Sequence, residues 1–342
     1  MNALKSLLKR LTSDPQLVLL LLVLALAVAG LSLFAGMLAP AIAAVVIAFL
    51  LEGGVAWLMR RGLGRLAATS VTFSVFMASA VIVLLLVIPP LVRQVGAFVE
   101  DSPAIFASLQ EALLSLQTRF PDFITQEQIT SLTKRLGDEA GTLGPRLLEY
   151  SVSGVTSALT LTVYAVLVPV MVFFFLKDKD SILTWCSRFL PRERSLLERV
   201  WGEVLARAGD YARGKVYEII IVGGVAFVTY QAVGLRYTAL LAVATGLSVL
   251  IPYVGAAVTT LPIALVAYFQ WGFSAEMGTA VAAYLILQAL DGNVLSPLLF
   301  SEVVKLHPNA IIIAILIFGG LWGFWGVFFA IPLATVTNAV IR

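Results

Sequence analysis

Long apolar stretches recur along this chain, and each is long enough to cross the roughly 30 Å hydrocarbon core of a bilayer as a helix. Sixty per cent of the residues are hydrophobic and 13% are charged, whereas soluble domains are about 45–50% apolar. In hydrocarbon an unsatisfied backbone group costs several kcal/mol, so the chain should stay helical wherever it meets lipid. The sequence therefore predicts an all-α, polytopic integral membrane protein.

About eight membrane segments can be marked from hydropathy and from helix-breaking residues. The chain should turn at Pro40 between the first two, and Pro89 and Pro90 should end the third. The sixth and eighth segments are too long for one crossing and contain Pro or Gly breaks, so we expect broken or hairpin helices in the C-terminal half. The segments cover about residues 16–38, 41–59, 66–92, 155–176, 216–233, 238–270, 277–295 and 308–341.

Charges in the connecting segments predict the orientation, because Lys and Arg gather on the cytoplasmic side. Residues 177–215 carry nine basic and six acidic side chains, whereas residues 93–150 carry five basic and eight acidic. The N-terminus is also basic, and we expect it in the cytoplasm. The expected regions are a three-helix membrane region (1–92), an extracytoplasmic amphipathic helical segment (93–150), a fourth transmembrane helix (151–176), a cytoplasmic basic amphipathic segment (177–215) and a C-terminal membrane region whose broken helices form the pathway (216–342).

Composition also argues against several classes of function. The net charge of +3 is small and the basic residues form local clusters, which argues against a nucleic-acid partner. Cys186 and His307 are each the single residue of their type, so a disulfide or a Cys- or His-based metal site is not expected. The chain lacks a nucleophile elbow, a P-loop and a dinucleotide fingerprint. We do not expect an enzyme, and we expect no cofactor. The expected partners are the lipid bilayer and a small polar solute or cation.

Asp291 is the first candidate for a functional residue, and it is followed by Gly292 and Asn293 near the end of the seventh segment. A carboxylate at the centre of a bilayer costs about 2.5–3.5 kcal/mol on insertion scales, so Asp291 should face a cavity or a partner. It could bind a cation, a proton or a polar solute. Alternatively, it could cap a half-helix that begins near Leu295, because Asp and Asn are good N-caps.

The sequence Pro252-Tyr253-Val254-Gly255 breaks the sixth segment. Backbone carbonyls that such a break frees can coordinate ions or polar groups, and discontinuous helices are the usual location of transporter sites. We expect this break to line a cavity. The alternative is a plain bend whose backbone groups are satisfied by neighbouring helices.

Three further titratable residues lie in or beside the predicted segments. Glu218 follows Lys215 by three residues on one helix face, which favours an ion pair between them. Glu52 stands beside small residues that let helices approach closely, so it could serve function or helix packing. His307 could carry a proton, but with Pro308 after it, the first turn of a helix is the simpler interpretation.

Several short motifs that contain glycine or proline lie in the last ninety or so residues of the chain. They are Ile251 to Gly255, Asn293 with Pro297, His307 with Pro308, and a run that contains Gly319, Gly320, Gly323, Gly326, Ala330 and Pro332.

These motifs together resemble the AI-2E family of bacterial membrane proteins over nearly the whole chain, and they are most similar to its PerM-like permeases. The resemblance implies a permease of the bacterial inner membrane that assembles as a homo-oligomer, a pentamer. Family members are associated with export of the signal autoinducer-2, and others with sodium/proton antiport.

We therefore expect an inner-membrane permease that moves a small polar solute, such as autoinducer-2, through its C-terminal half. One alternative is a cation/proton antiporter that uses Asp291. Another is a non-transporting membrane scaffold that recruits partners through its outer and inner segments. A scaffold does not need a carboxylate beside a broken helix.

The predicted orientation can be measured with single cysteines at Ser115 and Ser195 in a Cys186→Ser background. We expect membrane-impermeant maleimide to label Ser115→Cys from the periplasm and Ser195→Cys only after the inner face is opened. Labelling of both positions from the periplasm would rule out this orientation.

Overall fold

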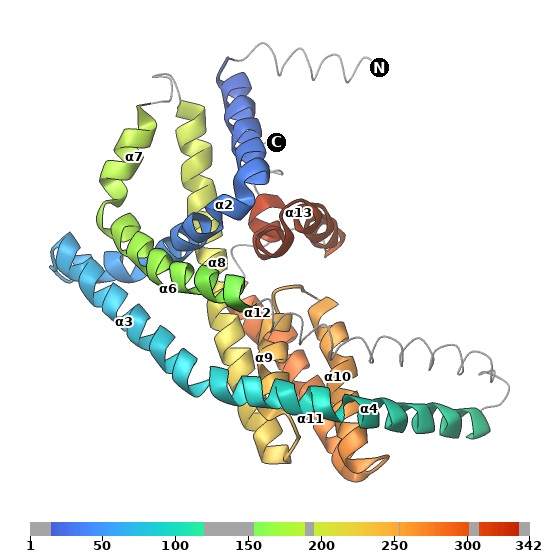
Figure 1. Ribbon diagram of the computed structural model, residues 1–342. Helices are drawn as coiled ribbons and strands as arrows, with labels where there is room; N and C mark the ends of the chain where they lie inside the picture. The colour runs from blue at the N-terminus through green and yellow to red at the C-terminus, as the bar shows by residue number, and fades with distance from the viewer. Residues whose placement is uncertain (1–14, 120–153, 189–194, 253, 301–307, 335–342) are drawn as a thin grey trace, which may run out of the picture. The chain divides into compact units, whose positions relative to one another are not determined.

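The computed structural model describes residues 15–119, 154–188, 195–252, 254–300 and 308–334, and within these ranges every regular element is a helix (Figure 1). Five helical stretches are long and apolar enough to cross a membrane. The prediction of an all-α polytopic membrane protein is thereby confirmed. The five stretches are Met37–Arg60, Arg65–Glu111, Gly209–Val233, Val254–Trp271 and Ala275–Phe300.

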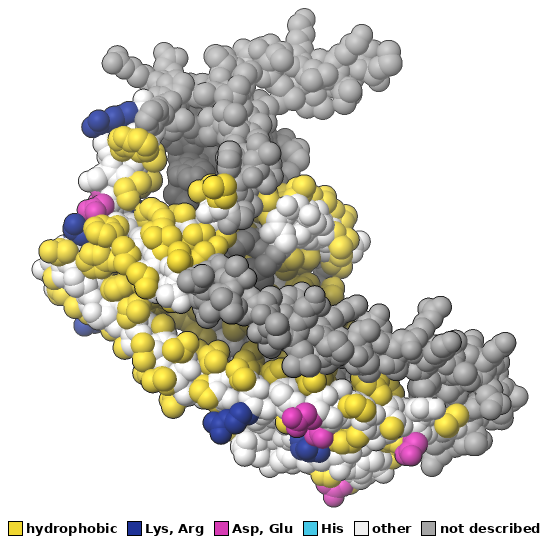
Figure 2. All heavy atoms as spheres, viewed as in Figure 1, with side chains coloured by type: hydrophobic (Ala, Val, Ile, Leu, Met, Phe, Trp, Pro, Cys, Tyr) yellow, Lys and Arg dark blue, Asp and Glu magenta, His cyan; other side chains and the backbone are white. Residues whose placement is uncertain are grey.

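Apolar side chains lie on the outside of these helices as well as between them, and they spread over the face shown in Figure 2. Along α3 (Arg65–Leu86), for example, Leu84, Leu85 and Leu86 are 61–69% exposed. In water such a surface would be costly at about 25 cal/mol per Å² of apolar area. It is the surface that a lipid-facing helix needs.

The chain forms two compact units. Among the described residues, the first comprises 15–78, 161–188, 195–213 and 308–334, and the second comprises 79–119, 154–160, 214–252 and 254–300. The helices besides α3 are α2 (Pro15–Arg60), α4 (Ile88–Arg119), α6 (Gly154–Lys177), α7 (Lys179–Ser187), α8 (Ser195–Val233), α9 (Thr238–Ser248), α10 (Val254–Trp271), α11 (Ala275–Leu290), the π-helix η1 (Asp291–Leu295), α12 (Ser296–Phe300) and α13 (Pro308–Phe328).

In the first unit, α2, α3 and α6 pack around a small apolar core. Ala44 and Val55 from α2, Ala68 from α3, and Val172 from α6 have no exposed surface. Small side chains let these helices approach closely, which is the usual way that membrane helices pack.

The predicted turn at Pro40 is wrong. Residues 15–60 form the single helix α2, and Pro40 lies inside it. Proline removes one backbone hydrogen bond and crowds the preceding turn, so it can bend a helix without ending it. Figure 1 shows that α2 changes direction along its length, as a bent helix does.

The second unit has a larger core, built by α8, α9, α10 and α11 with α4 against them. Tyr230, Ile263, Val266 and Tyr284 are at most 1% exposed within it. The hydroxyl groups of the buried tyrosines are bonded: Tyr230 Oη lies 2.9 Å from Thr245 Oγ1, and Tyr284 Oη lies 2.8 Å from Thr259 Oγ1. Buried polar groups need such partners.

The first part of the predicted outer segment is α4, which packs against α9 and α10. Ile105 is buried in the core, and Asp101 Oδ2 accepts hydrogen bonds from the Tyr237 hydroxyl (2.5 Å) and from Arg236 Nη2 (2.8 Å). Burial and the bond to Asp101 raise the pKa of Tyr237 to about 12. Gln94 Oε1 accepts from the Leu240 amide at 3.0 Å, in the first turn of α9. These polar contacts fix α4 on the second unit.

The expected breaks in the C-terminal half are confirmed, and the clearest is in α13. Gly323 has φ 58° and ψ −133°, a conformation that glycine adopts readily. A Cβ atom on Gly326 would overlap with the Phe318 carbonyl oxygen. Eight residues of straight helix span about 12 Å, so the chain must reverse at Gly323, and α13 is a hairpin.

The sixth predicted segment is also broken, with α9 ending at Ser248 and α10 beginning at Val254. A Cβ atom on Gly255 would overlap with the Ser248 carbonyl oxygen. The end of α9 and the start of α10 can therefore lie this close together because residue 255 has no side chain. By contrast, α8 runs without interruption across residue 215, where the sequence suggested a boundary between an inner segment and a membrane helix.

We predict that Gly255→Ala lowers the free energy of unfolding by at least about 1–3 kcal/mol, because the added methyl group forces α9 and α10 apart. Gly278→Ala on α11 is the matched control, since, apart from its chain neighbours and the nearby backbone of its own helix, no heavy atom of the described residues lies within 4 Å of the place that its methyl group would take. It should leave stability unchanged or raise it by about 0.5–1 kcal/mol. Unfolding of the detergent-solubilised variants measures both, and equal stabilities would contradict the close approach.

Candidate functional site

A cluster of charged and polar side chains is buried in the second unit, where α8 meets α12 and the end of α9. Lys215 Nζ donates to Glu218 Oε2 at 2.5 Å and to the Val249 carbonyl oxygen at 2.7 Å. Ser296 Oγ donates to Glu218 Oε1 at 2.5 Å. The side chains of Lys215 and Glu218 are only 5% and 1% exposed. The expected pair of Lys215 and Glu218 therefore exists, but inside the protein rather than at an interface with water.

The helix break explains why Lys215 binds a backbone carbonyl. The last carbonyl groups of a helix have no partner within the helix, and they carry the negative end of its dipole. Val249 directly follows α9, and its oxygen receives the lysine ammonium group. The ammonium group also lies 5.1 Å from the centre of the Phe300 ring, a cation–π arrangement. The Lys215 side chain thus donates a hydrogen bond to a carbonyl group that has no helical partner because of the break.

Asp291 lies beside this cluster, within electrostatic range of Glu218 and Lys215. Its Oδ1 atom is buried and has no hydrogen-bond partner among the described residues. Helical backbone continues from α11 through Asp291 into η1, so no free helix N-terminus is present there for it to cap. Segments of π-helix are frequent at functional sites because they displace one residue from the regular register.

The cluster has one ammonium group for two carboxylates. With Glu218 and Asp291 both ionised, its net charge is −1 at a place that water does not reach freely. An unpaired buried charge is costly, whereas a charge with a partner can be kept. With both carboxylates ionised, the cluster therefore lacks one positive charge.

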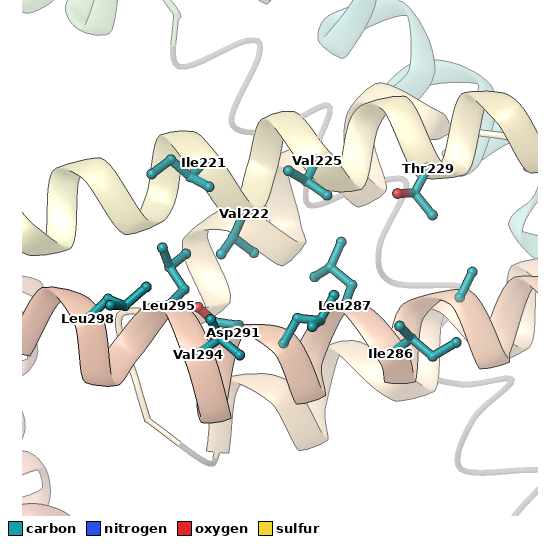
Figure 3. A pocket seen from close by; sticks show the side chains of 12 residues that line it. Ile221, Val222, Val225, Thr229, Ile286, Leu287, Asp291, Val294, Leu295 and Leu298 are labelled. Carbon is teal, nitrogen blue, oxygen red and sulfur yellow. The ribbon is translucent and has the colours of Figure 1, made fainter.

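Asp291 also forms part of the wall of an open groove of about 510 Å³ between α8 and the continuous stretch of α11, η1 and α12 (Figure 3). Thr229 and Asp291 are the polar residues in its lining. The other lining side chains are aliphatic, and they include Ile221, Val222 and Val225 of α8, Leu287 of α11, Val294 of η1 and Leu298 of α12.

The remaining residues singled out from the sequence lie elsewhere or contribute to folding. Asn293 is exposed and donates from Nδ2 to the Ala289 carbonyl oxygen at 2.8 Å. Pro252 lies in the break and Pro297 in the first turn of α12, while Gly320 is helical within α13. Pro308 is the first residue of α13, as expected from its fixed φ angle. Tyr253 and His307 lie outside the described residues.

Glu52 belongs to the first unit and holds helices together there. Lys179 Nζ donates to its Oε1 at 2.9 Å, and Arg65 Nη2 lies 3.5 Å from its Oε2. The same Arg65 donates to the Leu176 carbonyl oxygen at 2.7 Å, near the end of α6. This clamp joins α2, α3, α6 and α7, which favours the packing alternative for Glu52.

Sequence reasoning missed Ser296 and the carbonyl group of Val249. A serine before a proline has no distinguishing pattern, and any carbonyl near Pro252 was an equal candidate. The polar group formed by Tyr284, Thr259 and Gln288 was also missed, although Tyr284 and Gln288 are four apart on one helix face and Gln288 Nε2 donates to Tyr284 Oη at 2.9 Å.

Apolar helices long enough to cross a membrane, with a helix break beside a buried charge cluster, are typical of multi-pass membrane proteins of the permease type. The family model "AI-2E family transporter" matches residues 18–342, so the chain belongs to the AI-2E transporter family.

Three relatives of the chain are named as a permease or as transport proteins. The chain is 42% identical to "Putative permease PerM" of Escherichia coli K12 over 98% of its own length and 95% of that protein. It is 26% identical to "Putative transport protein YrrI" of Bacillus subtilis, over 88% and 85% of the two lengths. A "Putative transport protein" of Thermotoga maritima is 25% identical over 79% and 76%.

We predict that Lys215→Met lowers the free energy of unfolding by about 3–5 kcal/mol, because it leaves two buried carboxylates without a counter-ion. Glu218→Gln should cost less, since Asp291 still faces the ammonium group. Arg213→Met is the matched control on α8: Arg213 pairs with Asp210 at the same spacing but is 33% exposed, and should cost at most about 1 kcal/mol. Chemical denaturation in detergent measures all three, and equal losses for Lys215→Met and Arg213→Met would contradict a buried cluster.

Proposed function

We propose that this permease exchanges a cation for protons across the membrane, and that Asp291 binds the two in turn. The observation that carries the proposal is the charge imbalance of the cluster, one lysine for two carboxylates. A proton or a cation restores neutrality equally well, so a site of this kind favours binding one or the other and disfavours binding both.

Asp291 is a better exchange group than Glu218. Both oxygens of Glu218 are already bonded, one to Lys215 and one to Ser296. By contrast, Asp291 has an oxygen without a partner and lies in the groove wall. Lys215 and Ser296 then act as positioning residues that hold the Glu218 side chain in place.

The geometry supports a small polar solute such as autoinducer-2 less well. A solute with many hydroxyl groups loses hydrogen bonds to water when it enters an apolar site, at about 1–3 kcal/mol for each one not replaced. The groove has Thr229 and Asp291 to replace them. The names of the relatives describe permeases and transport proteins and specify no solute.

A scaffold without transport is also less well supported. Scaffolding requires exposed partner surfaces, whereas Lys215, Glu218 and the Asp291 Oδ1 atom are buried between membrane helices. Buried ionisable groups in membrane helices are expensive and usually mark ion or proton pathways. The charge distribution of the chain supports an inner-membrane location with a cytoplasmic N-terminus, and we extend the proposal to that orientation.

We predict that Asp291→Asn reduces exchange at least tenfold while leaving assembly intact, because asparagine keeps the shape but cannot ionise. Acid-loaded proteoliposomes containing a pH-sensitive dye measure the exchange when sodium, potassium or benzyltrimethylammonium is added outside. Glu276→Gln is the control, since Glu276 is a fully exposed carboxylate in the first turn of the same helix, α11.

Size-exclusion chromatography establishes that both variants assemble like the wild type. The wild type and Glu276→Gln should release protons when a cation is added, and Asp291→Asn should not. Exchange by Asp291→Asn at the wild-type rate, with the wild-type dependence on pH, would remove Asp291 from the transport step.

A further inference from the structure

We propose that the groove between α8 and the α11–η1–α12 stretch binds an amphipathic organic cation, whose charged nitrogen faces Asp291 and whose apolar body lies along the aliphatic walls. This inference rests on the proposed function and specifies the class of cation that is exchanged. It uses the shape and lining of the groove, which the charge imbalance alone does not determine.

The walls of the groove favour an organic body. The lining is aliphatic apart from Thr229 and Asp291, so a bound hydrocarbon group is removed from water on all the sides that it touches (Figure 3). Removal of apolar surface from water is the dominant favourable contribution to such binding. A volume of about 510 Å³ falls in the usual range of roughly 300–1,000 Å³ for sites that bind small molecules.

The Asp291 carboxylate in the groove wall favours a positively charged head group. An acyl chain in the groove would not supply the positive charge that the cluster lacks. A carboxylate ligand would add a further negative charge beside Asp291 and Glu218. A protonated amine supplies the missing positive charge.

The lining does not suit a compact inorganic cation. Hard metal ions are held by a shell of several oxygen atoms, and among the described residues no group of three or more acidic, histidine or cysteine side chains is placed to hold one. Two oxygens of the cluster, on Glu218 and Val249, already accept hydrogen bonds from Lys215. An organic cation is less strongly hydrated and gains from the aliphatic walls what it loses in hydration.

The head-group requirement can be tested with three probes that share the 4-phenylbutyl group: 4-phenylbutylamine, 4-phenylbutanol and 5-phenylvalerate. Equilibrium dialysis at pH 7 measures their binding to the full chain in nanodiscs, and empty nanodiscs give the partition into lipid. We expect saturable binding of the amine, at least tenfold tighter than that of the alcohol, and no saturable binding of the acid. Equal binding of amine and alcohol would overturn the proposal and indicate a site for lipid tails.

Two neighbouring isoleucines of α8 provide a matched pair for locating the site. Ile221 lines the groove and is 43% exposed, whereas Ile220 does not line it and is 64% exposed. Ile221→Trp should weaken amine binding at least tenfold, and Ile220→Trp should leave it unchanged. Equal loss in both variants, or none in either, would place the amine elsewhere.

Asp291→Asn should remove the preference for the amine over the alcohol. This measurement is independent of flux, so the two proposals can fail separately. If Asp291→Asn abolishes exchange but keeps the preference for the amine, the proposed exchange stands and the class of cation is wrong. If it loses the preference but exchanges normally, the groove binds amines and the proposed role of Asp291 in exchange is wrong.

A second copy of the chain is the other occupant to exclude. Val225→Cys in a Cys186→Ser background places one thiol in the groove wall. We expect this thiol to react with a small maleimide in the membrane, and 4-phenylbutylamine to slow the reaction. Efficient cross-linking of two chains through this thiol would show that a neighbouring subunit covers the groove, and would overturn the proposal.

Discussion

The ammonium group of Lys215 joins three elements that are far apart in the sequence. It bonds to Glu218 on its own helix and to the Val249 carbonyl at the end of α9, and it lies over the Phe300 ring of α12. Replacing a buried ion pair by well-packed apolar residues is often neutral or stabilising, whereas removing one partner is strongly destabilising. The pair is therefore better understood as a device that fixes one arrangement of the broken helices than as a source of stability.

Broken helices are tolerated in a membrane only where the protein itself satisfies the freed backbone groups, and the second unit does so in two ways. A side chain supplies a hydrogen bond, as Lys215 does for the Val249 carbonyl oxygen just after the end of α9. Alternatively, a missing side chain lets two backbones meet, as at Gly255 and at Gly246, where a Cβ atom would lie 2.9 Å from the Ile219 carbonyl oxygen. Neither solution gives Asp291 Oδ1 a hydrogen-bond partner among the described residues.

Local patterns in the sequence predicted the local features of this fold. Hydropathy predicted the five apolar helical stretches of the described residues, and Pro252 with Gly255 and the run around Gly323 located the breaks, because these residues act on their own backbone. The turn at Pro40 was wrong because an isolated proline can also bend a helix, and neighbouring helices decide between the two outcomes. The contacts of Ser296 with Glu218 and of Glu52 with Lys179 depend on how each helix is rotated about its axis. That rotation is set by packing over the whole unit, which no short pattern encodes. The homo-oligomer implied by the family resemblance stays a prediction.

In the π-helix at residues 291–295, the number of residues determines the direction in which the side chains that follow it point. Each residue of an α-helix turns the chain by about 100° and advances it by about 1.5 Å. The surplus residue in η1 therefore rotates everything that follows, and in this rotated setting Ser296 meets Glu218. Loss of one residue here would restore a regular helix and point the serine hydroxyl roughly a quarter-turn away from the carboxylate. During divergence of such sequences, a one-residue deletion in this segment would thus change the composition of the buried cluster without substituting any of its members.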